Sequence, residues 1–196
     1  VFLQKNQIDR ANIIAWSLGA QVALRLTLDR PELVQSLVLV STTPKFIADD
    51  NFPHGLSSAQ VRKRALDIKK DLISGINDFQ SRLFCRAEIK EKRFRPAFQI
   101  LKQCKPPSLD AALAGLEVLK TTDLRSELKN IQIPTLIIHG KEDSICPFPA
   151  AEYMAQTIPN AHLELMENTG HVPHLTRPEK FNSILNDFLK EGREFQ

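Results

Sequence analysis

Residues 11–29, ANIIAWSLGAQVALRLTLD, decide the fold class of this chain. The run from Ala11 to Ala15 is short and mostly apolar and contains two β-branched side chains, which is typical of a buried strand. The run from Gly19 to Asp29 has a helical pattern and ends before Pro31. The sequence therefore predicts a strand, a sharp turn at Ser17 and a helix.

A second apolar run extends this unit to a strand–helix–strand motif. Residues from Leu33 to Ser41 are almost continuously hydrophobic, as are strands of a parallel sheet that is covered on both faces. Strand and helix patterns return near the C-terminal end, at residues 133–139, 149–157, 161–166 and 179–190. We therefore expect an α/β protein with a mostly parallel sheet.

The middle of the chain has a different pattern, without any strand-like run. Helical patterns occupy Ser58–Ile73, Asn77–Ala87, Phe94–Gln103 and Leu109–Lys120, the last with Ser108 as its N-cap. We therefore divide the chain into an α/β core at 1–43 and 131–196 and a helical cap, inserted at 44–130, over the strand ends.

Composition excludes several classes of protein. With 196 residues, of which 42% are hydrophobic and 25% charged, the chain fits one globular domain. No apolar run reaches the roughly 18 residues that span a bilayer, and the first residues do not resemble a signal peptide. Three widely spaced cysteines (Cys85, Cys104 and Cys146) indicate neither a disulfide framework nor a zinc site. We expect a cytoplasmic protein that contacts no membrane.

Ser17 is the first candidate catalytic residue. In a nucleophile elbow the serine occupies a strained turn between strand and helix. The residues two before and two after it must be small so that strand and helix can pass closely, and Ala15 and Gly19 are both small. The helix N-terminus directs backbone N–H groups toward the serine, and the Leu18 N–H is the expected oxyanion donor. The alternative is that Ser17 only caps the helix.

Asp143 and His171 complete a candidate catalytic triad. Each follows a predicted strand, and the chain order of nucleophile, acid and base is that of a Ser–Asp–His hydrolase. His171 would take the Ser17 proton, and Asp143 would orient the imidazole. Taken singly, Asp143 could be a turn residue and His171 a loop residue, and Glu142 is a rival for the carboxylate.

The remaining histidines do not form a metal-binding pattern. His139 is expected to pack or hydrogen-bond at a strand end, and His174 could line the pocket. His162 lies early in a predicted strand and His54 in a loop, and the histidines form no metal-ligand cluster with Asp or Glu. The sequence therefore predicts a mechanism without metal or other cofactor.

Three segments resemble the α/β-hydrolase superfamily: NIIAWSLGAQVAL (12–24), LIIHGKEDSICP (136–147) and GHVPHLTRPEKFNSILNDFL (170–189). The segments WSLG (16–19) and GLEVLKTTDLR (115–125) are similar to the carboxylesterases of biotin synthesis. That family hydrolyses the methyl ester of pimeloyl-acyl-carrier-protein. The resemblance implies an α/β-hydrolase fold with a helical cap, and a substrate site that includes Trp16, Leu18, Phe79, Leu83 and His171. Phe79 and Leu83 fit a buried helix face equally well.

The segment 62–105 is basic, with thirteen Lys and Arg against five Asp and Glu. Most charge runs are solvated surfaces, but this one could also steer an acidic acyl carrier protein to the site. The resemblance implies contacts at Arg95, and the neighbouring cations Lys90, Lys92 and Arg93 are further candidates. Nucleic acid is not an expected partner, because interleaved aromatic residues and a known motif are lacking.

The resemblance also implies strands before residue 1 that this chain does not contain. We therefore expect an unpaired apolar sheet edge at 11–15, and low stability and weak or absent activity for these residues alone. A longer, monomeric protein would be the functional form. The alternatives are a generic short-chain carboxylesterase and a non-catalytic or truncated protein with the hydrolase fold.

Overall fold

A parallel sheet of four strands forms the centre of the protein. The computed structural model describes residues 2–194. The strands are β1 (Ala11–Trp16), β2 (Val34–Val40), β3 (Thr135–Gly140) and β4 (Ala161–Met166). They lie side by side in this order, and every neighbouring pair is parallel. The α/β class and the parallel sheet expected from the sequence are confirmed.

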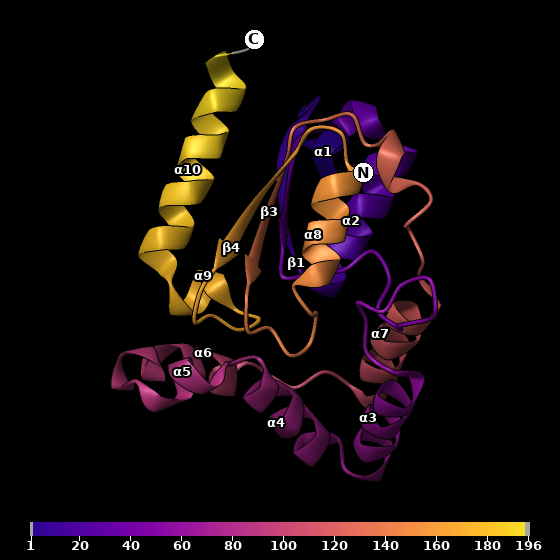
Figure 1. The fold of residues 1–196 in the computed structure, drawn as a ribbon, viewed down its shortest axis with the longest axis vertical. Coiled ribbons are helices and arrows are strands. Elements are labelled where there is room, and N and C mark those ends of the chain that lie inside the picture. The colour runs from indigo at the N-terminus through magenta and orange to yellow at the C-terminus, as the bar shows by residue number, and fades with distance from the viewer. Residues whose placement is uncertain (1, 195–196) are drawn as a thin grey trace.

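Helices cover both faces of the sheet (Figure 1). Helices α2 (Leu18–Asp29) and α8 (Pro149–Thr157) pack on one face, and α10 (Pro178–Glu194) packs on the other. Within β2, Leu37 and Leu39 belong to the apolar cluster of α2 and α8, whereas Val38 and Val40 belong to the cluster of α10. Because successive side chains of a strand point to opposite faces, this double cover requires the continuous apolar run of β2.

Helix α10 shows how an amphipathic pattern becomes packing. Phe181, Ile184, Leu185 and Phe188 recur at the spacing of one helix face, and all four contact the sheet cluster.

No helix in the described part of the chain combines the length and the apolarity needed to cross a membrane. The remaining short elements are α1 (Phe2–Lys5), α9 (Pro173–Thr176) and single 3-10 turns at Pro31–Leu33, Lys92–Phe94 and Leu128–Asn130.

Five further helices lie across the carboxyl ends of the strands (Figure 1). They are α3 (Ser58–Lys70), α4 (Leu72–Arg82), α5 (Arg86–Lys90), α6 (Arg95–Gln103) and α7 (Leu109–Thr121). We call them the cap helices, since they fall within residues 44–130. An apolar cluster joins them to the core, with Leu83 and Phe84 from the cap against Ile145 and Val172 from the core. The exact domain boundaries stay a prediction.

The sequence prediction was wrong about two helix boundaries in the cap. The helix predicted at Ser58–Ile73 ends at Lys70, because the Asp71 carboxylate accepts the Ser74 N–H at 3.1 Å and starts α4. The helix predicted at Asn77–Ala87 ends at Arg82. A new helix, α5, begins after Cys85, whose N–H donates to the Glu88 carboxylate at 2.8 Å.

Strand β1 forms one edge of the described sheet and pairs only with β2. This is the apolar edge that the sequence predicted, and Ile14 is 50% exposed there. Unpaired edge strands present free backbone N–H and C=O groups to other chains.

Candidate active site

Ser17 occupies a strained turn between β1 and α2. Its φ of 54° and ψ of −125° lie in a region that costs a non-glycine residue about 1–3 kcal/mol. Two hydrogen bonds hold this conformation: the Ser17 N–H donates to the Val40 carbonyl at 2.9 Å, and the Thr42 hydroxyl donates to the Ser17 carbonyl at 2.9 Å. Val40 is the last residue of β2 and Thr42 lies two residues after it, so the end of the neighbouring strand fixes the position of the serine.

A chain of two hydrogen bonds connects Ser17, His171 and Asp143. The Ser17 hydroxyl lies 2.9 Å from His171 Nε2, and His171 Nδ1 lies 2.7 Å from Asp143 Oδ2. The side chains of His171 and Asp143 are fully buried. With Nδ1–H donating to the carboxylate, Nε2 has a free lone pair that accepts the serine proton. The structure thus brings together the three residues predicted from their positions after strands.

The loop after β3 keeps the Asp143 carboxylate ionised. Oδ1 accepts the backbone N–H groups of Ile145 and Cys146 at 2.8 and 2.9 Å, while Oδ2 faces His171. Burial alone would raise the pKa of Asp143, but the charge and hydrogen bond of His171, together with His139 and the loop N–H groups, outweigh it. The net pKa of Asp143 is therefore lowered.

His139 and Glu142 lie next to the hydrogen-bonded Ser17, His171 and Asp143 but have other roles. His139 Nε2 donates to the Cys146 carbonyl at 2.7 Å, and complete burial lowers the pKa of His139 and favours the neutral ring. Glu142, the rival carboxylate, accepts the Thr169 N–H at 2.7 Å. Within the described residues, no cluster of three or more His, Cys, Asp or Glu side chains could hold a metal ion.

The cap accepts hydrogen bonds from the backbone N–H groups of Gly170 and His171. The His171 N–H donates to the Leu83 carbonyl at 2.8 Å, and the Gly170 N–H donates to Glu88 Oε2 at 3.0 Å. From the core, the Trp16 indole N–H donates to the His171 carbonyl at 2.8 Å. Position 170 must be glycine, because a Cβ would lie 2.7 Å from the Leu83 carbonyl oxygen.

Glu88 should be essential to this contact as a hydrogen-bond acceptor. It is fully buried, and one of its oxygens accepts both Gly170 N–H and Cys85 N–H. We expect Glu88→Ala to destabilise the protein by about 2–5 kcal/mol, because two buried donors lose their partner. Glu88→Gln should retain most of the stability, because an amide oxygen can accept both bonds.

Urea denaturation and kcat/KM on a short-chain ester check this expectation, with Glu88→Gln as the matched control. A Glu88→Ala protein as stable and active as the unmodified one would contradict it.

An apolar cavity of about 260 Å³ opens at Ser17. Its walls come from the start of α2, the loop after β3 and the cap helices α3, α4 and α7. Leu18 lines it, and because α2 begins at this residue, its N–H is among those that lack a partner within the helix. The other lining residues include Phe46, Ile68, Ile76, Phe79, Leu116, Leu119 and Ile145.

Comparison with known proteins agrees with this geometry. The sequence profile of the α/β hydrolase fold matches residues 1–178. This chain belongs to the α/β-hydrolase fold family. It is 37% identical over 177 residues to a pimeloyl-[acyl-carrier protein] methyl ester esterase of Nitrosomonas europaea, covering 90% of this chain and 70% of that protein. A protein of the same name from Aromatoleum aromaticum is 33% identical over 190 residues, covering 93% and 75%.

Solved structures show the same fold. An esterase from Exiguobacterium antarcticum superposes with a TM-score of 0.86 at 29% identity, covering 96% of this chain and 70% of that one. The strand order, the turn at Ser17 and the hydrogen-bonded Ser17, His171 and Asp143 are thus found in a chain whose relatives are carboxylic ester hydrolases. This α/β hydrolase is a carboxylic ester hydrolase by family.

Two residues expected in the substrate site of this α/β hydrolase do not line its cavity. Leu83 is only 1% exposed, because its side chain packs in the cluster between cap and core and only its carbonyl contacts the site. Trp16 packs against the rings of His171 and His174 at 5.4 and 5.3 Å. Phe79 lines the cavity. His171 adjoins it through its bond to Ser17.

The expectation that Gly19 must be small is also not met by the described residues. A Cβ at Gly19 would have no heavy atom within 4 Å, because this side of α2 is exposed. The strained backbone of Ser17, rather than close packing at Gly19, is therefore the feature of the elbow that the structure shows.

Sequence reasoning missed Arg64, which also lines the cavity. A signal was present, since Arg64 lies three residues after Val61 and four before Ile68, and both of these side chains are buried. Residues at this spacing share one face of a helix. An arginine on the buried face of α3 could thus have been noticed from the sequence.

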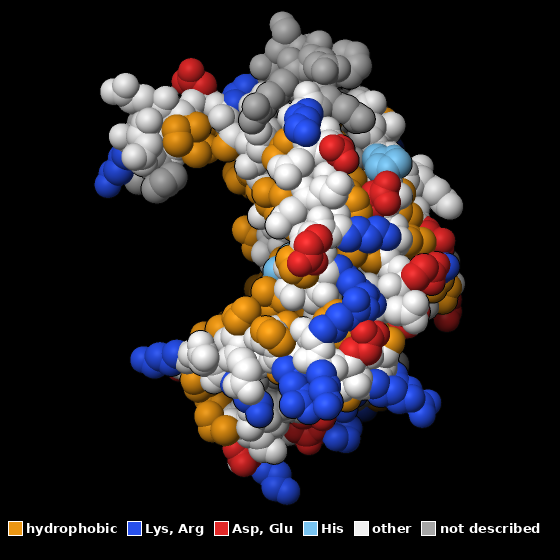
Figure 2. Space-filling view, turned by 90° about the vertical axis from the view of Figure 1, so that its left-hand side faces the viewer, with side chains coloured by type: hydrophobic (Ala, Val, Ile, Leu, Met, Phe, Trp, Pro, Cys, Tyr) orange, Lys and Arg blue, Asp and Glu red, His pale blue; other side chains and the backbone are white. Residues whose placement is uncertain are grey.

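The four cations predicted to contact a carrier protein are exposed on the cap. Lys90 ends α5, Lys92 and Arg93 lie in the following turn, and Arg95 begins α6. Arg93 pairs with Glu91 at 2.6 Å and lies over the Phe94 ring, 4.8 Å from its centroid. Figure 2 shows Lys and Arg side chains gathered over the lower part of the molecule, where these helices lie.

Proposed function

We propose that this α/β hydrolase is a serine carboxylesterase that hydrolyses the methyl ester of pimeloyl-acyl-carrier-protein, a step of biotin synthesis. The observation that carries the reaction class is the hydrogen-bonded chain from Ser17 through His171 to Asp143, next to an apolar cavity. The names of the relatives from Nitrosomonas europaea and Aromatoleum aromaticum support the choice of substrate.

In the first half-reaction, Ser17 Oγ attacks the ester carbonyl while its proton moves to His171 Nε2. The negative charge that develops on the carbonyl oxygen is stabilised by the Leu18 N–H at the start of α2. Asp143 holds the Nδ1–H and stabilises the imidazolium that forms. Breaking the ester C–O bond transfers the His171 proton to the leaving oxygen, which releases methanol and leaves an acyl group on Ser17.

In the second half-reaction, water replaces the alcohol. His171 Nε2 takes a proton from the water as its oxygen attacks the acyl carbonyl, and then returns a proton to Ser17 Oγ. The C–O bond to Ser17 breaks, and the product leaves as a free carboxylate.

The exposed cations of the cap support a carrier-bound substrate. Lys90, Lys92 and Arg95 make no ion pair with any described residue, so their charges are available to an acidic partner. Electrostatic steering of this kind raises association rates about 10- to 1000-fold and weakens with salt. It should act on the carrier protein and not on a small neutral ester.

The test is the hydrolysis of pimeloyl-acyl-carrier-protein methyl ester at low and high salt. We expect kcat/KM for this substrate to fall with salt, and the double variant Lys92→Glu, Arg95→Glu to reduce it about tenfold at low salt. A short methyl ester should be unaffected by both changes. Lys190→Glu, an exposed position on α10 outside the cap, is the matched control.

Activity on small esters without activity on the carrier-bound ester would instead favour a generic short-chain carboxylesterase. Absence of Ser17-dependent hydrolysis of any ester would favour a non-catalytic protein with this fold. The monomeric state and the cytoplasmic location stay predictions.

A further inference from the structure

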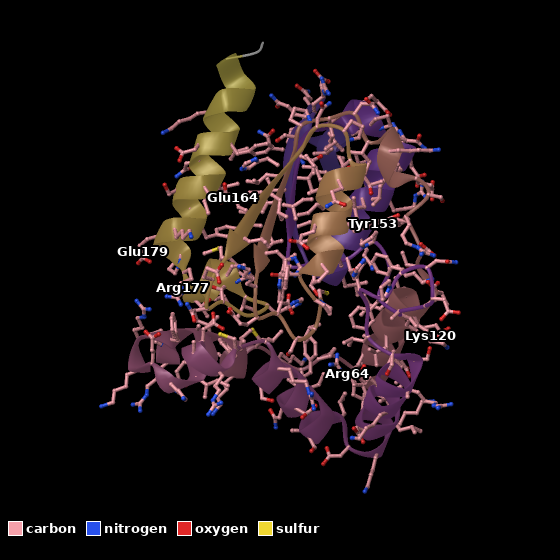
Figure 3. All side chains as sticks on the ribbon, viewed as in Figure 1. Arg64, Lys120, Tyr153, Glu164, Arg177 and Glu179 are labelled. Atoms are coloured by element: carbon pink, nitrogen blue, oxygen red, sulfur yellow. The ribbon has the colours of Figure 1, made fainter. Side chains whose placement is uncertain are left out.

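A cation without an assigned counter-ion lies in the wall of the apolar cavity. Arg64 projects from the buried face of α3, and in Figure 3 it lies on the inner side of that helix, facing α4. Ser17 lines the same cavity, together with apolar side chains of α4 and α7. Any acyl chain bound to Ser17 therefore shares this space with a guanidinium group.

The carboxylates beside Arg64 are held by other cations. Asp67 lies 2.8 Å from Lys63, and Asp78 accepts two hydrogen bonds from Arg82 at 2.8 and 3.2 Å. Arg64 itself makes no hydrogen bond or ion pair with the residues that the structure describes.

Partial burial makes this arrangement costly without a ligand. Burial, with a smaller contribution from Arg82, lowers the pKa of Arg64 despite the opposing effect of Asp78. The guanidinium nevertheless stays charged in proteins, and its five N–H groups are donors only. It therefore needs oxygen acceptors, and the two carboxylates of the cavity wall, Asp67 and Asp78, are already paired with Lys63 and Arg82.

The proposed reaction supplies such an acceptor. The scissile ester must lie at Ser17, so the rest of the acyl chain lies along the apolar wall. A simple fatty chain in this cavity would offer the guanidinium no acceptor. A dicarboxylic chain carries a second carbonyl or carboxylate oxygen at its far end, and such an oxygen suits a guanidinium group.

We propose that Arg64 binds this second oxygen, so that the cavity selects methyl esters of dicarboxylic acyl chains over methyl esters of simple fatty acids. In the proposed carrier-bound substrate, the second oxygen belongs to the thioester carbonyl. The inference rests on the proposed function in one respect, since it requires an ester at Ser17.

The experiment compares two small esters of equal chain length, monomethyl pimelate and methyl heptanoate. The unmodified protein should prefer monomethyl pimelate by about tenfold to a hundredfold in kcat/KM, the range expected for a hydrogen bond to a charged group. Arg64→Leu should remove this preference through a higher KM for monomethyl pimelate. Arg62→Leu, at an exposed position of the same helix, should keep the preference.

Dimethyl pimelate, whose second carbonyl is neutral, should show a smaller preference that Arg64→Leu also removes. Equal kcat/KM values for monomethyl pimelate and methyl heptanoate in the unmodified protein would overturn the proposal, whatever the variant does. A preference that survives in Arg64→Leu would overturn it as well.

Failure of the proposed function has a different signature. In that case, either the carrier-bound ester is not hydrolysed or hydrolysis of methyl heptanoate survives in Ser17→Ala.

Discussion

Replacing Ser17 with alanine should lower kcat by about ten thousand- to a million-fold on every ester substrate. The variant loses the oxygen that forms the acyl intermediate, and His171 Nε2 loses its partner at 2.9 Å. The fold should persist, because the Ser17 side chain makes no hydrogen bond to the helix that it precedes. Initial rates on a short-chain ester and labelling by a fluorophosphonate measure the loss directly.

Ser41→Ala is the matched control. Ser41 is also buried with a positive φ, of 47°, and its hydroxyl has no hydrogen-bond partner among the described residues. That variant should label with fluorophosphonate and turn over substrate at nearly the unmodified rate. Residual turnover in Ser17→Ala within tenfold of the unmodified protein would exclude Ser17 as the nucleophile.

The second large effect should come from Asp143→Asn, which we expect to lower kcat about ten thousand-fold. The loop N–H groups of Ile145 and Cys146 both point at one oxygen of this side chain. An asparagine must keep its oxygen there, so its NH₂ group faces His171. The neutral ring then accepts a hydrogen bond at Nδ1 and carries its proton on Nε2, so Nε2 cannot accept the proton of Ser17.

The matched control for this substitution is Glu142→Gln, because Glu142 is adjacent in sequence and bonds Thr169 rather than His171. We expect that variant to stay within about tenfold of the unmodified kcat. Comparable losses in Glu142→Gln and Asp143→Asn would contradict the assignment of Asp143 as the residue that orients His171. Circular dichroism of both variants separates loss of catalysis from loss of fold.

The strands and helices of the core could be predicted because the order of apolar and polar residues within each element reflects which of its faces are buried. The apolar run of β2 reflects cover on both faces, and the spacing of Phe181, Ile184 and Phe188 reflects one face of α10. The order of Ser17, Asp143 and His171 along the chain was readable for a related reason. Parallel strands place their carboxyl ends at one edge of the sheet, so residues just after three such strands are predicted to meet.

The contacts of the cap depend on distant residues and were not predictable in the same way. Asp71 fits a helix interior or an N-cap equally well by sequence, and its bond to Ser74 decides between them. Glu88 reads as a solvated charge within a basic segment, yet it is buried, because Gly170, 82 residues further along the chain, donates to it. Leu83 was expected to contact substrate, but its place in the cluster between cap and core depends on side chains from the far end of the chain.

The hydrogen bonds of Leu83 and Glu88 to the His171 loop limit how this hydrolase can open. If the whole cap moved away as one rigid body, the Leu83 carbonyl and the Glu88 carboxylate would move with it. The loop that holds His171 would then lose both of these hydrogen bonds. The cap around α5 therefore has to stay in place whenever the active site is assembled. An acyl chain has to enter on the other side of the cap, where α3, α4 and α7 border the cavity and make none of the hydrogen bonds to the His171 loop.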